Sequence, residues 1–283
     1  MDAKKPELII PDPNCLSAAS QEAKAETVGI TKTNLDVTRC FALSLMAGIQ
    51  IGLGALFMLF VKSDSSLPFA ASQVLGGLCF SVGLICVIVA GSELFTGNNL
   101  MVMARLSGKI SWGALLKNWV IVWVGNFIGS LILVAIVFMC NSAGMNSENV
   151  GKAMVSVATS KINMSWVTIF FRGILCNLLV CLAVWMGFAG KSVVDKIFTS
   201  IFPVMAFVAC GFEHCVANMF FLPMGVVAYN SGFGADVANA AACMNVGGVL
   251  YNISAATLGN IVGGAIIVGC IYWIAYHKKN SEK

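Results

Sequence analysis

The sequence contains few charged residues and very few histidines. Only 11% of its 283 residues are Asp, Glu, Lys or Arg, whereas 58% are hydrophobic. Soluble domains carry roughly twice as much charge, so the composition excludes an ordinary soluble protein. Of the two histidines, His214 and His277, only His214 falls within a long apolar run. This excludes a metal site or catalytic dyad built from two histidines of the apolar runs.

Cysteine is frequent, but it lacks the spacing of metal and redox motifs. Eleven cysteines are present, and no two stand as Cys-x-x-Cys, which argues against a zinc ribbon or a thioredoxin-like site. Most fall within apolar runs or at their edges, where we expect them to act as small packing residues. No metal and no other cofactor is expected.

Six long apolar segments dominate the chain. We place them near residues 37–61, 69–95, 114–139, 164–189, 198–229 and 249–276. Each is long enough to supply the roughly 20 apolar residues that a helix needs to cross a bilayer. The runs lack the alternation of a membrane β-barrel, which is the other structure able to span lipid. The sequence therefore predicts an all-α integral membrane protein with six membrane-spanning helices, a channel domain at residues 37–276.

Polar segments flank this domain, with one predicted tail at residues 1–36 and another at 277–283. The N-terminus shows no signal-peptide pattern. The stretch Ser17–Val28 predicts either a short surface helix packed under the membrane domain or part of a disordered tail.

Lysine and arginine are distributed unevenly around the spans. With the N-terminus inside, thirteen of them fall in inner segments, and only Lys62, Lys152 and Lys161 fall in outer ones. By the positive-inside rule we expect both termini in the cytoplasm. The membrane is expected to be the plasma membrane, the inner membrane of the cell. The net charge of +4 is then a signature of topology, and no nucleic-acid partner is expected.

Two motifs occur twice in the same order. GSELFTGNN at 91–99 matches GFEHCVANM at 211–219, and VGNFIG at 124–129 matches LGNIVG at 258–263. With three spans per repeat, about 37–139 and 164–276, the halves cross the membrane in opposite directions, which defines an inverted repeat. The first motif is rich in Gly and Asn in both halves, so the second and fifth helices are predicted to be broken there. Broken helices need protein or water around their backbone, and helix N-termini favour anions.

His214 and Thr96 are the strongest candidates for a functional role. An ionisable side chain inside a span is costly and histidine titrates near neutral pH, although a satisfied structural histidine is the alternative. Thr96 lies at the corresponding break of the first repeat. There it could hydrogen-bond the imidazole across the pseudo-twofold axis or only bond back to its own helix.

The other polar residues of the breaks are predicted to be architectural. Glu93 and Glu213 recur in both repeats, which favours a shared role such as capping the free N–H groups of a half-helix. The asparagines expected to tie the broken backbone are Asn98, Asn218, Asn126 and Asn260. Asn177 is a candidate pore-facing donor, and Lys161 would attract anions if it lines an entrance or do nothing as a solvated loop residue.

These segments resemble the formate/nitrite transporter family. The similarity lies in GGLCFSVGL, GSELFTG, KNWVIVWVGN, CNLLVCLAVWM, FVACGFEHCVANM and TLGNIVGG, and it runs from about residue 40 to 276. The resemblance implies a homopentamer of an aquaporin-like fold with one pore per protomer. It also implies passage of small monovalent anions such as formate, nitrite, hydrosulfide, acetate or lactate.

The resemblance further implies roles for single residues. His214 matches the family's central histidine, Thr96 its loop threonine, Asn177 its pore-facing asparagine and Lys161 its outer lysine. Five apolar residues that periodicity alone assigns to the core match the family's narrow hydrophobic rings. They are Phe80 and Phe207 on one side, and Leu84, Leu94 and Val180 on the other.

Together these expectations predict a pH-dependent channel for small monovalent anions. The anion is drawn in by Lys161 and the helix dipoles, and it crosses the two apolar constrictions as the neutral acid, because a charge in a low dielectric is costly. His214 would supply or relay the proton, or stabilise the anion as imidazolium. Formate is the expected substrate, with nitrite or hydrosulfide passage, or proton-coupled acetate or lactate transport, as alternatives.

Two other function classes compete with this hypothesis. An intramembrane enzyme would need Glu213, His214 and Cys215 to act together, but adjacent side chains on one backbone point in different directions. A water or neutral-solute pore would fit the repeat, but the paired Asn-Pro-Ala loops of aquaporins are missing. We therefore expect no enzymatic activity.

Overall fold

The computed structural model describes residues 15–277. The elements in chain order are α1 (Ala18–Thr33), α2 (Val37–Lys62), α3 (Phe69–Ala90), α4 (Phe95–Asn98), η1 (Asn99–Met101), α5 (Val102–Leu106), α6 (Trp112–Met139), η2 (Ser142–Gly144), α7 (Asn149–Ile162), α8 (Trp166–Ala189), α9 (Val193–Ala209), α10 (Cys215–Asn230), α11 (Ala240–Cys243), α12 (Val246–Ile261), the π-helical η3 (Val262–Cys270) and α13 (Ile271–Tyr276). Within residues 15–277 there is no strand beyond one isolated bridge. Residues 1–14 of the predicted N-terminal tail and 278–283 of the C-terminal tail lie outside this description.

In the described part of the chain, five helical runs are long and apolar enough to cross a membrane: α2, α3, α6, α8 and the continuous stretch Val246–Tyr276. Their starts are marked by polar caps, because the side chains of Asp36, Ser111 and Ser165 accept backbone N–H groups at α2, α6 and α8. Large apolar side chains stay exposed along these helices, as a surface in contact with lipid requires. The remaining predicted span consists of α9 and α10, which follow one another across a break.

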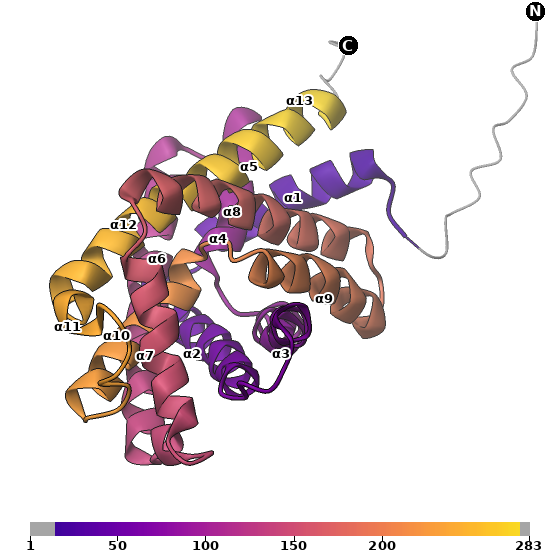
Figure 1. Ribbon diagram of the computed structural model, residues 1–283. Helices are drawn as coiled ribbons and strands as arrows, with labels where there is room; N and C mark the ends of the chain where they lie inside the picture. Colours follow the sequence, from indigo (N-terminus) through magenta and orange to yellow (C-terminus); the bar gives the residue numbers. More distant parts are fainter. Residues whose placement is uncertain (1–14, 278–283) are drawn as a thin grey trace, which may run out of the picture.

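Both predicted helix breaks are present. Helix α3 ends at Ala90, where Gly91 takes a left-handed φ of 80°, and the chain then runs extended before α4 begins. Helix α9 ends at Ala209, and Gly211 has a φ of 69°. Glycine adopts this conformation without the clash that a Cβ would cause. The half-helices α4 and α10 start in the buried interior of the molecule (Figure 1).

The bounds of the broken helices differ from those predicted from the sequence. The second span does not stop at residue 95, since α4, η1 and α5 continue its second half to Leu106. Polar residues in this half masked its helical character. The fifth span starts at Val193 rather than at 198, because Ser192 and Asp195 form a reciprocal capping box there.

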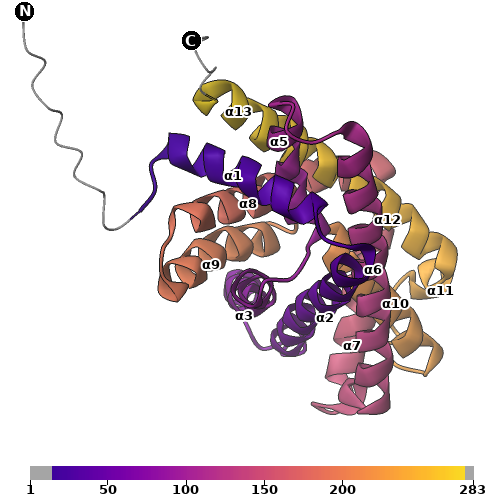
Figure 2. The ribbon, with the colours of Figure 1, turned by 180° about the vertical axis from the view of Figure 1, so that it is seen from behind.

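The N-terminal segment forms a helix, which decides between the two alternatives for this part of the tail. Helix α1 begins after Ser17, whose hydroxyl accepts the Ser20 N–H, and it extends to Thr33. It packs against α5, α8 and α13. Figures 1 and 2 show α1 and α13 at the same end of the molecule. The two ends of the described chain therefore lie on one face.

The glycines of the repeated Gly-Asn-x-x-Gly motif bring pairs of helices into backbone contact. A Cβ on Gly259 would lie 2.1 Å from the Phe170 carbonyl oxygen, and a Cβ on Gly129 would lie 2.1 Å from that of Leu45. Only glycine permits such an approach of α12 to α8 and of α6 to α2. This packing carries the asparagine of each motif to a helix break.

Candidate functional site

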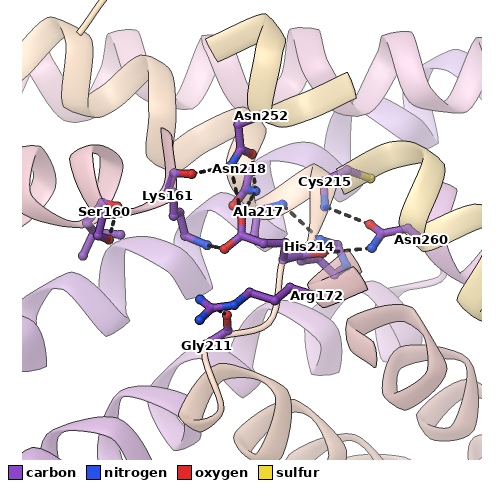
Figure 3. Close-up of polar contacts among 12 residues, drawn as sticks. Ser160, Lys161, Arg172, Gly211, His214, Cys215, Ala217, Asn218, Asn252 and Asn260 are labelled. Carbon is purple, nitrogen blue, oxygen red and sulfur yellow. Dashed lines mark hydrogen bonds and ion pairs between the residues drawn. The ribbon is translucent and has the colours of Figure 1, made fainter. Parts of the chain in front are cut away.

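Asn260 joins the break before α10 to the rest of the second repeat. Its side-chain oxygen accepts the Cys215 N–H at 2.9 Å, and its amide donates to the carbonyls of Glu213 (2.9 Å) and Gly173 (2.8 Å). Figure 3 shows this amide beside the start of α10. The exposed backbone groups of the break are thus satisfied by one buried side chain.

Asn126 makes the same contacts in the first repeat. Its oxygen accepts the Phe95 N–H at 3.0 Å, and its amide donates to the carbonyls of Glu93 (2.9 Å) and Ser44 (2.8 Å). The two breaks are therefore equivalent in hydrogen bonding, as an inverted repeat requires.

The Glu213 carboxylate is the centre of a buried hydrogen-bond network. Lys161 donates to one Glu213 oxygen at 2.8 Å, and Asn218 donates to the other at 2.6 Å and to the Asn252 oxygen at 2.7 Å. Figure 3 shows Lys161, Asn218 and Asn252 converging from three elements. Glu213 is 1% exposed, so Lys161 balances a charge that would otherwise be buried alone.

The first repeat contains a matching network around Glu93. Lys32 of α1 donates to one Glu93 oxygen at 2.6 Å, and Asn98 donates to the other at 2.7 Å and to Asn118 at 2.9 Å. The carboxylates in both networks accept from lysine and asparagine side chains, and the first N–H of each half-helix is held by Asn126 or Asn260 instead. The architectural role expected of Glu93 and Glu213 stays a prediction.

His214 lies at the N-cap of α10 and contacts the other half of the molecule. Its Nδ1 accepts the Ala217 N–H at 3.0 Å, and its Nε2 lies 3.0 Å from the Thr96 hydroxyl. A nitrogen that accepts a hydrogen bond carries no proton, so this geometry assigns the proton to Nε2. The neutral Nε2–H imidazole then donates to Thr96. Protonating Nδ1 would break the cap on α10.

One cavity, here named the Lys161 cavity, has a volume of about 420 Å³. Three cationic side chains, Lys62, Lys161 and Arg172, line it together with the single carboxylate of Glu213. Arg172 donates to the Gly211 carbonyl at 3.2 Å, which ties it to the break. Its lining also includes His214, Phe80 and Phe207.

The second cavity, the Lys32 cavity, has a volume of about 270 Å³ and the same charge pattern. Its lining contains Lys24, Lys32 and Lys196 with the single carboxylate of Glu93. Burial, with Lys196 nearby, lowers the pKa of Lys24, as expected where cations crowd together. The lining also includes Leu84 and Leu94.

Apolar side chains separate these cavities, which share no lining residue within the described chain. Phe80 and Phe207 pack edge to face with ring centroids 5.8 Å apart, and Phe207 stacks on the His214 ring at the same separation. All five residues assigned to the rings by resemblance are at most 3% exposed: Phe80, Phe207, Leu84, Leu94 and Val180. Their role as constrictions stays a prediction.

Asn177 lies behind Thr96 and does not line either cavity. Its amide donates to the carbonyls of Thr96 (3.2 Å) and Asn260 (2.7 Å). Gly264 makes room for it, because a Cβ there would lie 2.3 Å from the amide nitrogen. Asn177 thus holds the main chain next to the His214–Thr96 contact.

Sequence reasoning missed several charged residues of the cavities, above all Lys32 and Arg172. The repeat offered a signal for Lys32, because it precedes the start of α2 at Val37 by the same interval that separates Lys161 from the start of α8 at Trp166. The structural repeat therefore includes α1 and α7 and is longer than the predicted one. Arg172 offered no comparable pattern.

Comparison with known proteins identifies the family to which a chain with this fold and these cavities belongs. The profile of the formate/nitrite transporter family matches residues 21–274. The chain belongs to the formate/nitrite transporter family. This membership confirms the resemblance inferred from the motifs. It makes the chain an integral membrane protein of a transporter family with an aquaporin-like fold, and it leaves the enzyme alternative without support.

Individual members of the formate/nitrite transporter family show the extent of the similarity. The formate channel FocA of Escherichia coli K12 is 35% identical, with 94% of this chain and 96% of FocA covered. The formate channel FocA of Haemophilus influenzae is 38% identical over 87% of this chain and 89% of that protein. A solved pentameric formate channel with formate bound superposes with a TM-score of 0.75 and 37% identity, covering 86% of this chain and 98% of the other.

Proposed function

We propose that this protein is a channel for small monovalent anions, with formate as the main substrate. The observation that carries the proposal is the pair of cavities, each with three cationic side chains and one carboxylate, on either side of a buried apolar barrier. The formate channels among the relatives support formate over nitrite, hydrosulfide, acetate and lactate.

The excess of cations in each cavity attracts an anion from either side. Lys161 is paired with Glu213, and Lys32 with Glu93, so much of the net attraction comes from the other cations. These are Lys62 and Arg172 in the Lys161 cavity, and Lys24 and Lys196 in the Lys32 cavity. Because half-buried charges are screened less than exposed ones, attraction here survives at physiological salt.

The apolar barrier determines the form in which the substrate crosses. Moving an isolated ion into apolar surroundings costs tens of kcal/mol, whereas a neutral polar group costs roughly 2–7 kcal/mol. A weak acid escapes most of this penalty by binding a proton as water is removed. We therefore propose that formate crosses the barrier as formic acid.

His214 assists this step as a neutral hydrogen-bond donor. Its Nε2–H meets the Thr96 hydroxyl at 3.0 Å, between the two halves of the protein. Because Nδ1 accepts the Ala217 N–H, the ring stays neutral. Its Nε2–H is then a polar partner without a fixed charge that a passing acid contacts in an otherwise apolar passage. We therefore propose a donor role for His214 in preference to that of a resting imidazolium.

The proposal also covers assembly and orientation. The protein is proposed to form a homopentamer with one pore per protomer, as supported by the pentameric formate channel that it resembles. Both termini are proposed to face the cytoplasm of the plasma membrane. The Lys32 cavity, which α1 borders, would then be the cytoplasmic entrance, and the Lys161 cavity the outer one.

A flux comparison tests the proposed function. Formate, nitrite, hydrosulfide, acetate and lactate are compared in one preparation of proteoliposomes at several external pH values, with protein-free liposomes as control for leakage of the neutral acids. Formate is expected to show the largest protein-dependent flux. If the protein-dependent flux of any other anion equals or exceeds that of formate, the assignment of formate as the main substrate is contradicted.

A further inference from the structure

Three ionisable side chains meet where α1 packs against the end of α13. Glu22 and Glu26 lie one turn apart on α1, and His277 directly follows α13. The carboxylates are only 3% and 2% exposed, and His277 is partly buried. One donor atom from each residue lies within 4.8 Å of the other two. This Glu22–Glu26–His277 cluster is separate from both cavities of the proposed pore.

Glu22 is the member of the cluster that lacks compensation. Both oxygens of the Glu26 carboxylate have a hydrogen-bond donor, because Lys109 contacts one and the Ser107 hydroxyl contacts the other. Oε1 of Glu22 is buried without a hydrogen bond, and His277 Nδ1 lies 3.4 Å from it. Glu22 thus presents to the cluster a buried oxygen that lacks a hydrogen-bond partner.

Two of the three distances between the donor atoms match those of a tetrahedral metal site. With metal–ligand distances of about 2.0–2.1 Å, donors at neighbouring corners of a tetrahedron are roughly 3.3 Å apart. His277 Nδ1 lies 3.2 Å from Glu26 Oε1 and 3.4 Å from Glu22 Oε1. His277 Nδ1 therefore needs little movement to share an ion with either carboxylate, and the two carboxylate donors lie within 4.8 Å of each other.

The surroundings position the histidine and leave space for water. The His277 ring stacks on Trp273 with centroids 4.9 Å apart, and the Trp273 indole donates to the Ser107 hydroxyl at 2.7 Å. A cavity of about 280 Å³ borders all three cluster members, so a water molecule has access as a fourth ligand. Lys109 contacts Glu26 at Oε2, and Oε1, which accepts the Ser107 hydroxyl, has a second lone pair for the metal.

We propose that Glu22, Glu26 and His277 form a binding site for a first-row divalent cation, with Zn²⁺ as the best fit. One imidazole and two carboxylates suit Zn²⁺, whereas Mg²⁺ and Ca²⁺ require six or more oxygen ligands. The ion joins α1 to the end of α13. Because α1 also carries Lys32, which pairs with Glu93, the bound metal stabilises one wall of the Lys32 cavity.

Equilibrium dialysis with Zn²⁺ on the full-length protein in detergent tests the site. We expect one Zn²⁺ per protomer that excess Mg²⁺ does not displace. His277→Ala and Glu22→Gln should each weaken binding by about tenfold or more, the range seen even for outer partners of metal ligands. Glu148→Gln, an exposed carboxylate remote from the cluster, should bind as the unaltered protein does. Absence of binding, or unchanged binding in both cluster variants, would overturn the proposal.

Spectroscopy of Co²⁺ bound to the unaltered protein keeps the test independent of how the variants fold. Oxygen and nitrogen ligands predict tetrahedral visible absorption without a thiolate charge-transfer band. A thiolate band would place the metal on cysteine and overturn the assignment. Amide hydrogen exchange over residues 18–33 should slow when Zn²⁺ is added to the unaltered protein. An exchange rate that Zn²⁺ does not change would contradict the joining of α1 to α13.

Discussion

At the scale of single residues, the contacts of His214 limit which proton it can hold. Ala217 donates to Nδ1, and Thr96 lies at hydrogen-bond distance from Nε2. The imidazole can give up its cap on α10 or keep the neutral Nε2–H form, but it cannot be doubly protonated and accept at Nδ1. His214 therefore has two roles: it caps the N-terminus of α10, and it offers a hydrogen-bond donor at the centre of the proposed passage.

Thr96→Val tests the His214–Thr96 contact. Valine keeps the shape of threonine but removes the hydroxyl, so the buried Nε2–H loses its partner at a cost of about 1–3 kcal/mol. We expect formate flux in proteoliposomes to fall by about tenfold, the equivalent of about 1.4 kcal/mol. Thr96→Ser retains the hydroxyl and should stay near the unaltered rate. Equal flux in the two variants would refute a role for this hydrogen bond.

The sequence predicted the approach of Thr96 to His214 but not the ion pair of Lys32 with Glu93. The first followed from two unusual residues at matching breaks of a repeat. The second joins a helix of the N-terminal segment to a break that lies 61 positions further along the chain, and a lysine in a polar segment looks like an ordinary surface residue. Arg172 was hidden for a related reason, since its carbonyl partner at Gly211 belongs to backbone whose course only the fold determines.

At the scale of elements, two asparagines hold the broken helices in place. Each satisfies two backbone groups that a continuous helix would pair internally, and ties them to a carbonyl of a neighbouring helix, α8 or α2. The repeated motifs predicted the breaks because glycine and asparagine interrupt helices in a recognisable way. The continuation through α5 could not be predicted so well, since a short run of α and 3₁₀ turns has no clear period.

Asn260→Ala is expected to destabilise the fold strongly. It strips partners from the Cys215 N–H and from the carbonyls of Glu213 and Gly173, and each buried unpaired group costs about 1–3 kcal/mol. Thermal unfolding in detergent should show a clear fall in midpoint and loss of the intact oligomer. The control is Asn230→Ala, an exposed residue at the end of α10. A midpoint for Asn260→Ala equal to that control would contradict the account.

The Lys161–Glu213 pair offers a second test at this scale. Lys161→Met leaves Glu213 buried without its cation, and breaking a buried pair typically costs about 3–5 kcal/mol. The double variant Lys161→Met with Glu213→Gln removes both charges. It should recover most of the lost thermal stability in detergent. If the double variant is no more stable than the single one, the lysine does not serve to balance the glutamate.

At the scale of the whole molecule, the Lys161 and Lys32 cavities, which we propose as the two entrances of the passage, have equal charge patterns. A passage built this way has no preferred direction of its own, because each side carries three cations and one carboxylate. The direction of net transport must then follow the gradients of substrate and proton. Composition and the inverted repeat made this plan predictable, whereas the volumes of the cavities depended on the packing of side chains.

External pH should control uptake if the neutral acid is the species that crosses. Lowering the external pH raises the fraction of formic acid, so formate uptake into proteoliposomes should increase. The increase approaches about tenfold per pH unit while the anion predominates, since one unit equals about 1.4 kcal/mol in proton free energy. His214→Phe should reduce uptake to the level of protein-free liposomes at every pH. Full flux in this variant would remove His214 from the mechanism.

The most direct test of neutral passage measures charge and protons together during formate flux. Proteoliposomes with a formate gradient are placed under voltage clamp conditions set by potassium and valinomycin, while a pH-sensitive dye reports the interior. The account predicts that each formate entering brings one proton and that the imposed potential leaves the rate unchanged. A formate flux that follows the potential without acidifying the interior would show that the anion itself crosses, and would contradict the account.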